Sequence, residues 1–154
     1  MSSRDYEEFV ESLTRHGARF LIVGAHAVAL YAQPRATKDL DVLIDNDADN
    51  AVRVLDAIRD FFGGADLGIS AADLTEPGRV VQLGVSPARI DILTSLPSVA
   101  HFERAWSNRV DSSFGSVAAH YLSLDELLRE KEGSNRLQDQ ADAENLRRAR
   151  SSDS

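Results

Sequence analysis

The stretch Asp39-Leu40-Asp41-Val42-Leu43-Ile44 sets two carboxylates inside a run of aliphatic residues. Side chains of a β-strand alternate between its two faces, so Asp39 and Asp41 share one face with Leu43, and the other three aliphatic residues share the opposite face. A rise of about 3.3 Å per residue places the two aspartate α-carbons roughly 6 to 7 Å apart, close enough for their side chains to converge on one ion. The stretch therefore predicts a strand that carries part of a functional site.

A second apolar run with an acid in its middle is Arg89-Ile90-Asp91-Ile92-Leu93. The preceding run, Val80 to Val85, and the turn residues Ser86-Pro87-Ala88 predict a hairpin. Each aspartate alone is compatible with an ordinary exposed or ion-paired strand residue. All three together, in strands where a charge is normally unwelcome, favour a common site.

Three gathered carboxylates raise one another's pKa, which a purely structural site rarely tolerates. A hard, oxygen-seeking cation such as Mg²⁺ or Mn²⁺ removes that repulsion, and Mg²⁺ is usually held by a few carboxylates together with substrate phosphates. Two such ions about 3.5 to 4 Å apart stabilise the attacking and leaving oxygens of a phosphoryl displacement. We therefore predict a divalent-metal site formed by Asp39, Asp41 and Asp91.

The remaining pattern predicts an α+β fold with a small mixed β-sheet flanked by helices. Gly24 separates a buried strand, Phe20–Val23, from a helix over residues 25–32, and backbone N–H groups at such a helix start can cradle phosphate. Pro34 ends that helix. One helix is expected to begin at a cap on Asp47 and run to about residue 60, with Val52, Leu55 and Ile58 as its apolar face, and another to run from a Ser123 cap to about 132. Further helices are expected at 5–16, near 71–74, at 99–108 and from about 137. Two short strands are expected around 114–115.

Length and composition bound the protein class. The 154 residues, 43% hydrophobic and 27% charged, predict one globular domain over residues 1–146 and a charged, frayed tail over 147–154. Cysteine is absent, so disulfides and thiolate metal sites are excluded. With neither a signal peptide nor an apolar run long enough to span a membrane, a cytoplasmic location without a membrane partner is expected.

The formal net charge of −8 opposes binding to nucleic acid over the whole surface. Basic residues nevertheless crowd the last quarter of the chain, interspersed with acids. They form either a solvated helix face or a local contact surface for RNA. The four histidines lack metal-ligand spacing, and His26 is the one that lies in the predicted phosphate loop.

The segment Val23-Gly24-Ala25-His26-Ala27 resembles the glycine loop of the DNA polymerase β-like nucleotidyltransferase superfamily. Thirteen residues, His26 to Lys38, separate this loop from Asp39. The Arg35-x-Thr37-x-Asp39-x-Asp41 form is similar to its Asp-x-Asp strand. Together with Lys131 and the later Asp139 and Asp142, it most resembles the small bacterial branch that includes AbiEii-type toxins. The resemblance spans roughly residues 18–146.

This resemblance implies a nucleotidyltransferase fold and a role for each matching residue. Asp39, Asp41 and Asp91 would be catalytic and would bind Mg²⁺ or Mn²⁺, and Asp91 would help to activate the attacking hydroxyl. Five residues would contact the nucleoside triphosphate: Gly24, Ala25, Arg35, Thr37 and Lys131. The implied reaction moves a nucleoside monophosphate from a triphosphate such as ATP to a hydroxyl of RNA (tRNA included), protein or a small molecule, with release of pyrophosphate.

The chain departs from the family pattern at two positions, and one of these departures, Ala25, together with the small size of the chain favours a rival hypothesis. Ala25 stands where the family often has serine or glycine, and Gln138 stands where relatives often carry lysine. The rival is a weakly active or inactive relative that binds a nucleotide or a partner protein, for example as half of a toxin–antitoxin pair. The sequence leaves the acceptor and the preferred triphosphate open.

Overall fold

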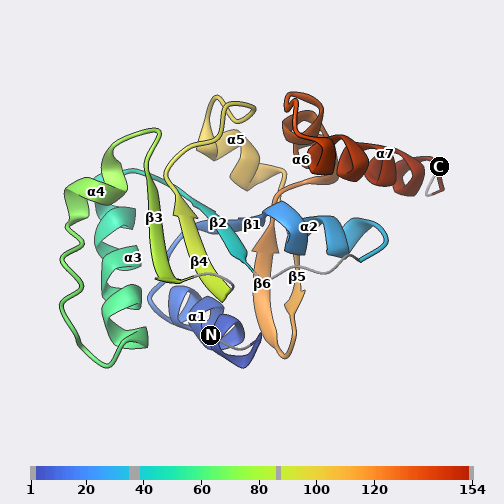
Figure 1. The fold of residues 1–154 in the computed structure, drawn as a ribbon. Helices are drawn as coiled ribbons and strands as arrows, with labels where there is room; N and C mark the ends of the chain where they lie inside the picture. The colour runs from blue at the N-terminus through green and yellow to red at the C-terminus, as the bar shows by residue number, and fades with distance from the viewer. Residues whose placement is uncertain (1–2, 35–38, 86–87, 153–154) are drawn as a thin grey trace.

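The computed structural model describes residues 3–34, 39–85 and 88–152, and its centre is a six-stranded mixed sheet flanked by helices (Figure 1). The strand order is β3-β4-β2-β1-β6-β5. The predicted α+β class and mixed sheet are confirmed. The strands are β1 Phe20–Val23, β2 Leu40–Ile44, β3 Val80–Val85, β4 Ala88–Leu93, β5 Val110–Phe114 and β6 Val117–Tyr121.

Two parallel pairs lie within a largely antiparallel sheet. Strand β2 runs parallel to β4 and β1 runs parallel to β6, whereas β1–β2, β3–β4 and β5–β6 are antiparallel. The β2–β4 register pairs Asp41 with Asp91. Since paired residues of adjacent strands point to the same face, these two carboxylates are neighbours.

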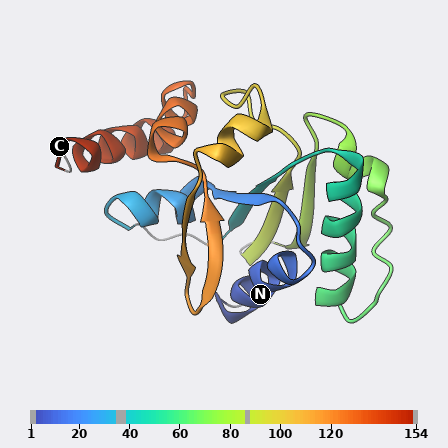
Figure 2. The ribbon, with the colours of Figure 1, turned by 180° about the vertical axis from the view of Figure 1, so that it is seen from behind.

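The helices are α1 Ser3–Arg15, α2 Gly24–Tyr31, α3 Ala48–Phe61, α4 Ala71–Thr75, α5 Phe102–Ser107, α6 Leu124–Glu132 and α7 Leu137–Ser152. Helix α1 packs against α3 and β6, and α2 packs against β1, β2, α6 and α7. Figures 1 and 2, seen from opposite sides, both place the α6–α7 pair at one end of the molecule and α3 with α4 at the other.

Local sequence signals explain where several helices begin and end. Asp47 caps α3 by accepting a hydrogen bond from the Asn50 N–H at 2.7 Å. The buried Asn50 side chain donates to the carbonyls of Arg19 and Asp45, which ties the start of α3 to the ends of β1 and β2. Gly17, with φ of +69°, turns the chain from α1 into β1.

Three expected details differ in the structure. Val52 is 50% exposed, because the buried face of α3 is formed by Ala51, Val54, Leu55, Ala57 and Ile58. Helix α5 covers 102–107 instead of 99–108, since Val99 pairs with Leu96 in an isolated bridge before the helix. Helix α7 continues to Ser152, through residues expected to be a tail.

Among the described helices, none combines the length and the apolar composition that are needed to cross a bilayer.

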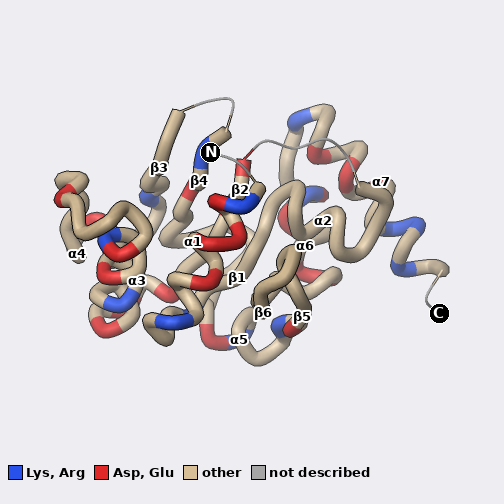
Figure 3. The backbone as a smooth tube through the Cα atoms, turned by 90° about the horizontal axis from the view of Figure 1, so that it is seen from below, with Lys and Arg blue, Asp and Glu red and all other residues tan. Residues whose placement is uncertain are grey.

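Seen from below, the tube of Figure 3 shows acidic residues gathered around α1 and β2, while basic residues mark the distal part of α7.

Candidate active site

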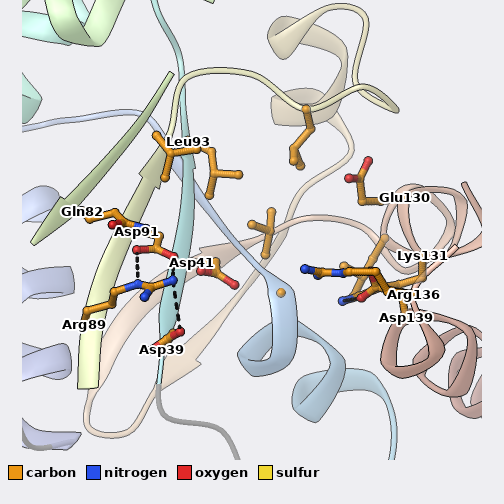
Figure 4. Close-up of a pocket in the computed structure, with 15 residues that line it drawn as sticks. Asp39, Asp41, Gln82, Arg89, Asp91, Leu93, Glu130, Lys131, Arg136 and Asp139 are labelled. Atoms are coloured by element: carbon orange, nitrogen blue, oxygen red, sulfur yellow. Dashed lines mark hydrogen bonds and ion pairs between the residues drawn. The ribbon is translucent and has the colours of Figure 1, made fainter. Parts of the chain in front are cut away.

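A pocket of about 450 Å³ lies between the β2–β4 part of the sheet and the α6–α7 pair. Asp39, Asp41 and Asp91 line one wall, and Glu130, Lys131, Arg136 and Asp139 line the other, as Figure 4 shows. The structure thus brings the three predicted carboxylates together in one cavity. Asp39 lies just before β2 rather than within it.

Gly24 forms the edge of this pocket where β1 meets α2. Its φ is +68°, a conformation that residues with a Cβ rarely adopt. A Cβ at this position would also lie 3.0 Å from Cγ of Asp41 and closer still to its Oδ2. The glycine is therefore required twice, once by the backbone conformation and once by the approach of the carboxylate.

Arg89 reaches across the aspartate wall from β4. Its Nε donates to Asp91 Oδ1 at 2.9 Å, its Nη2 donates to Asp91 Oδ2 at 3.3 Å, and Nη2 lies 3.7 Å from Asp39 Oδ2. The Arg89 side chain is 28% exposed, and Figure 4 shows it between the two carboxylates. One guanidinium thus pairs with two of the three aspartates.

Asp41 is the aspartate that Arg89 compensates least. Burial, which is the largest cause, and the charges of Asp91 and Asp39 together raise its pKa from the ordinary 3.8 to about 6. The positive charges of Lys131 and Arg89 lower this pKa only in part. A crowded, partly desolvated carboxylate of this kind is typical of functional sites.

Helix α6 and the start of α7 build the opposite wall around a buried ion cluster. Lys131 Nζ lies 3.0 Å from Asp139 Oδ1 and 3.2 Å from Asp142 Oδ2, and all three side chains are less than a tenth exposed. Although burial raises the pKa of Asp139, hydrogen bonds from Ser134, Arg136 and Lys131 outweigh it and hold that pKa well below its usual range. This cluster fixes α7 against α6.

Arg136 is the cation that this wall presents to the pocket. Its Nε donates to Asp139 Oδ2 at 3.0 Å, yet its side chain is 81% exposed. In Figure 4 it extends from the α6–α7 turn towards the aspartates. An arginine anchored at one end and exposed at the other can bind an anionic ligand with its remaining donors.

The other predicted ligand residues are placed differently. Lys131 lines the pocket, but its ammonium is engaged by Asp139 and Asp142. Ala25 is only 7% exposed and is not among the residues that line the pocket. Arg35 and Thr37 lie outside the described residues.

His26 packs between two rings and does not line the pocket. Its ring centroid lies 5.9 Å from that of Tyr6 and 5.2 Å from that of Phe114, both in edge-on arrangements. Its Nε2 is buried and has no hydrogen-bond partner among the described residues. Burial lowers the pKa of His26, so the ring is neutral near pH 7.

Sequence reasoning missed Arg89 and Arg136 as parts of the site. Arg89 could have been found, because it lies two residues before Asp91 on the same face of one strand. The place of Arg136 depends on how α7 folds back onto α6, which no local pattern records. Gln82, on β3 opposite Asp91, also lines the pocket.

The donor chemistry of the aspartate wall fits a divalent metal ion. Three carboxylates supply the hard oxygens that Mg²⁺ and Mn²⁺ prefer, and two of them are in register on adjacent strands. Arg89 now holds oxygens of Asp91 and Asp39, and within the described ranges no three acidic or histidine side chains are already arranged around one metal position.

Geometry and charge thus define the site as two facing walls, one of carboxylates and one led by an exposed arginine. Such a pairing suits a ligand that carries both a metal-binding group and further negative charge.

A scan against protein-family models and a search of curated proteins both found no match for this chain.

Proposed function

We propose that this protein is a metal-dependent nucleotidyltransferase that moves a nucleoside monophosphate from a nucleoside triphosphate to a hydroxyl acceptor. The observation that carries the proposal is the register of Asp41 with Asp91 on adjacent parallel strands, beside the glycine at the β1–α2 junction. The β1–Gly24–α2–β2 path and the third carboxylate on β4 further support a nucleotidyltransferase fold.

In the proposed reaction the acceptor oxygen bonds to the α-phosphorus, the bond from that phosphorus to the bridging oxygen breaks, and pyrophosphate leaves. Asp91 accepts the hydroxyl proton, directly or through water. Asp39, Asp41 and Asp91 would hold Mg²⁺ or Mn²⁺, which would supply Lewis-acid stabilisation of the developing charge. The Gly24 N–H group, at the start of α2, would donate to the phosphates.

On the opposite wall, we assign the main phosphate contact to Arg136. Its exposed guanidinium extends into the pocket, whereas the Lys131 ammonium is buried between two carboxylates. Lys131 then acts as a positioning residue, because it holds Asp139, and Asp139 in turn holds Arg136. The two assignments can be separated by experiment. A variant of Arg136 should weaken phosphate binding, whereas a variant of Lys131 should mainly lower the stability of the fold.

The proposed activity is tested by incubating the purified protein with each of four α-³²P-labelled ribonucleoside triphosphates, MnCl₂ or MgCl₂, and total RNA, tRNA or protein. Label transfer to one acceptor is expected for the natural sequence and not for Asp41→Asn. Transfer that persists in Asp41→Asn, or no transfer with any acceptor despite demonstrated triphosphate binding, would overturn the proposal.

A second candidate is a protein of the same fold that binds a nucleotide or partner without turnover, for example within a toxin–antitoxin pair in the cytoplasm. The observation that favours it is the pairing of Arg89 with Asp91 and Asp39. Triphosphate binding without label transfer, together with co-purification of a specific partner, would support this role.

A further inference from the structure

The guanidinium of Arg89 lies between the carboxylates of Asp91 and Asp39, where the electrostatic attraction for a cation is strongest. Both of its contacts with Asp91 are hydrogen bonds of 2.9 and 3.3 Å, and the Asp39 carboxylate lies 3.7 Å away. Charge-assisted, two-point contacts of this type are among the stronger polar interactions in proteins. The arginine therefore neutralises a large part of the aspartate wall.

The Arg89 side chain reaches the surface of the pocket. Its side chain is 28% exposed at the pocket surface, whereas its backbone is held in the β3–β4 ladder and by the Tyr6 hydroxyl, which donates to the Arg89 carbonyl at 3.3 Å. The backbone can thus stay in place while the side chain leaves. A half-buried arginine at a pocket surface that pairs with carboxylates can exchange with another cation, since the two compete for the same oxygens.

We propose that Arg89 is a built-in counter-ion of the carboxylate site, and that a divalent metal ion binds only by displacing its guanidinium from Asp91 and Asp39. This inference rests on the proposed metal site. Its physical basis is competition: the same oxygens cannot coordinate an ion and accept the arginine hydrogen bonds at full strength. Metal affinity is consequently lower than the three carboxylates alone would give.

The counter-ion also stabilises the metal-free protein, because without it three carboxylates would face one another in a partly buried pocket. A neutral side chain at position 89 should thus have opposite effects on two measurements. It should lower the melting temperature without metal and tighten metal binding. A side chain with a merely structural role would change only the first.

The experiment is calorimetric titration of the full chain with MnCl₂ alone, comparing the natural sequence, Arg89→Gln, Arg89→Lys and the control Arg79→Gln. Arg79 pairs with Glu76 at 2.7 Å and is not among the residues that line the pocket. Arg89→Gln should bind Mn²⁺ roughly tenfold more tightly, the factor that corresponds to about 1.4 kcal/mol. Arg89→Lys should lie between, because lysine cannot make the two-point contact, and Arg79→Gln should match the natural sequence.

Melting curves with and without MnCl₂ complete the test. Arg89→Gln should melt lower than the natural sequence in metal-free buffer and gain more from added Mn²⁺. Equal Mn²⁺ affinity of Arg89→Gln and the natural sequence would overturn the counter-ion role while leaving the proposed metal site intact. Absence of Mn²⁺ binding in every variant, including Arg89→Gln, would overturn both, and weaker binding in Arg89→Gln would show that Arg89 assists the metal instead of opposing it.

Discussion

Gly24 lies directly against the carboxylate of Asp41, so that a side chain at position 24 would occupy the space that the aspartate fills. The contact joins the β1–α2 junction to β2, two segments that pair in the register Val23 to Asp41. The glycine loop and the first carboxylate strand are thus one structural unit. Substitution at either position should disturb the other.

Gly24→Ala should destabilise the protein and weaken Mn²⁺ binding. The φ of +68° costs about 1 to 2 kcal/mol for a residue with a Cβ, and overlap with Asp41 adds to this. Gly63→Ala is the matched control, since Gly63 has φ of +70° but no atom within 4 Å of an added Cβ. Urea denaturation should give a larger loss for Gly24→Ala; equal losses would contradict the packing argument.

Asp41→Asn should stabilise the metal-free protein at pH 7.5. The pKa of Asp41 is about 6 in the folded protein against 3.8 ordinarily, so the folded state binds more protons between about pH 4 and 6 and its stability falls as the pH rises through this window. The loss of stability caused by ionised Asp41 is fully present above about pH 6 and is on the order of 1 to 3 kcal/mol. Asparagine removes it, so the two proteins should differ less at pH 4.5 than at 7.5 in urea denaturation, and a loss of stability at pH 7.5 would indicate a structural ion pair instead.

Arg136→Gln should weaken the binding of pyrophosphate and triphosphate roughly tenfold without a comparable change in melting temperature, because charge-assisted contacts contribute about 1.5 to 3 kcal/mol. Arg136→Lys should restore part of the affinity. The control is Arg148→Gln, which removes an exposed arginine that pairs with Glu144 within α7. Calorimetric titration with pyrophosphate in MgCl₂ measures the effect, and unchanged affinity in Arg136→Gln would exclude Arg136 as the phosphate contact.

Lys131→Met should destabilise the fold by about 3 kcal/mol, because it leaves Asp139 and Asp142 buried without their common cation. The double variant Lys131→Met with Asp142→Asn should recover part of the loss, since one buried negative charge is removed. Urea denaturation measures both. A loss below about 0.5 kcal/mol, combined with weaker triphosphate binding, would restore Lys131 as the phosphate contact predicted from the sequence.

Local patterns were sufficient to predict most elements of the fold. Alternation in Asp39–Ile44 and in Arg89–Leu93 predicted two strands that the structure contains, apart from a shift of one residue at the start of each. The Asp47 and Ser123 caps were also confirmed. These signals are reliable because strand alternation and capping depend on residues within a few positions of one another.

The errors arose where tertiary contacts decide. Val52 has helical spacing with Leu55, but the surface that α1 offers to α3 selects a face centred on Val54 and Ala57. The partners of Lys131 could not be read from the sequence either, and its role as a phosphate contact stays a prediction. The fold supplies Asp139 and Asp142 from the next helix, eight and eleven positions later, and both pair with the lysine ammonium.

The two walls of the pocket come from parts of the chain that are made at different times. The aspartate wall is complete at residue 93, whereas the facing residues lie between 127 and 139. Because synthesis proceeds from the amino terminus and domains fold as units, a ribosome-bound chain that ends before residue 136 has its carboxylates but lacks Arg136 and the ion cluster that holds it. The pocket is therefore complete only after the helix that carries Asp139 and Asp142 has been made and has docked onto α6.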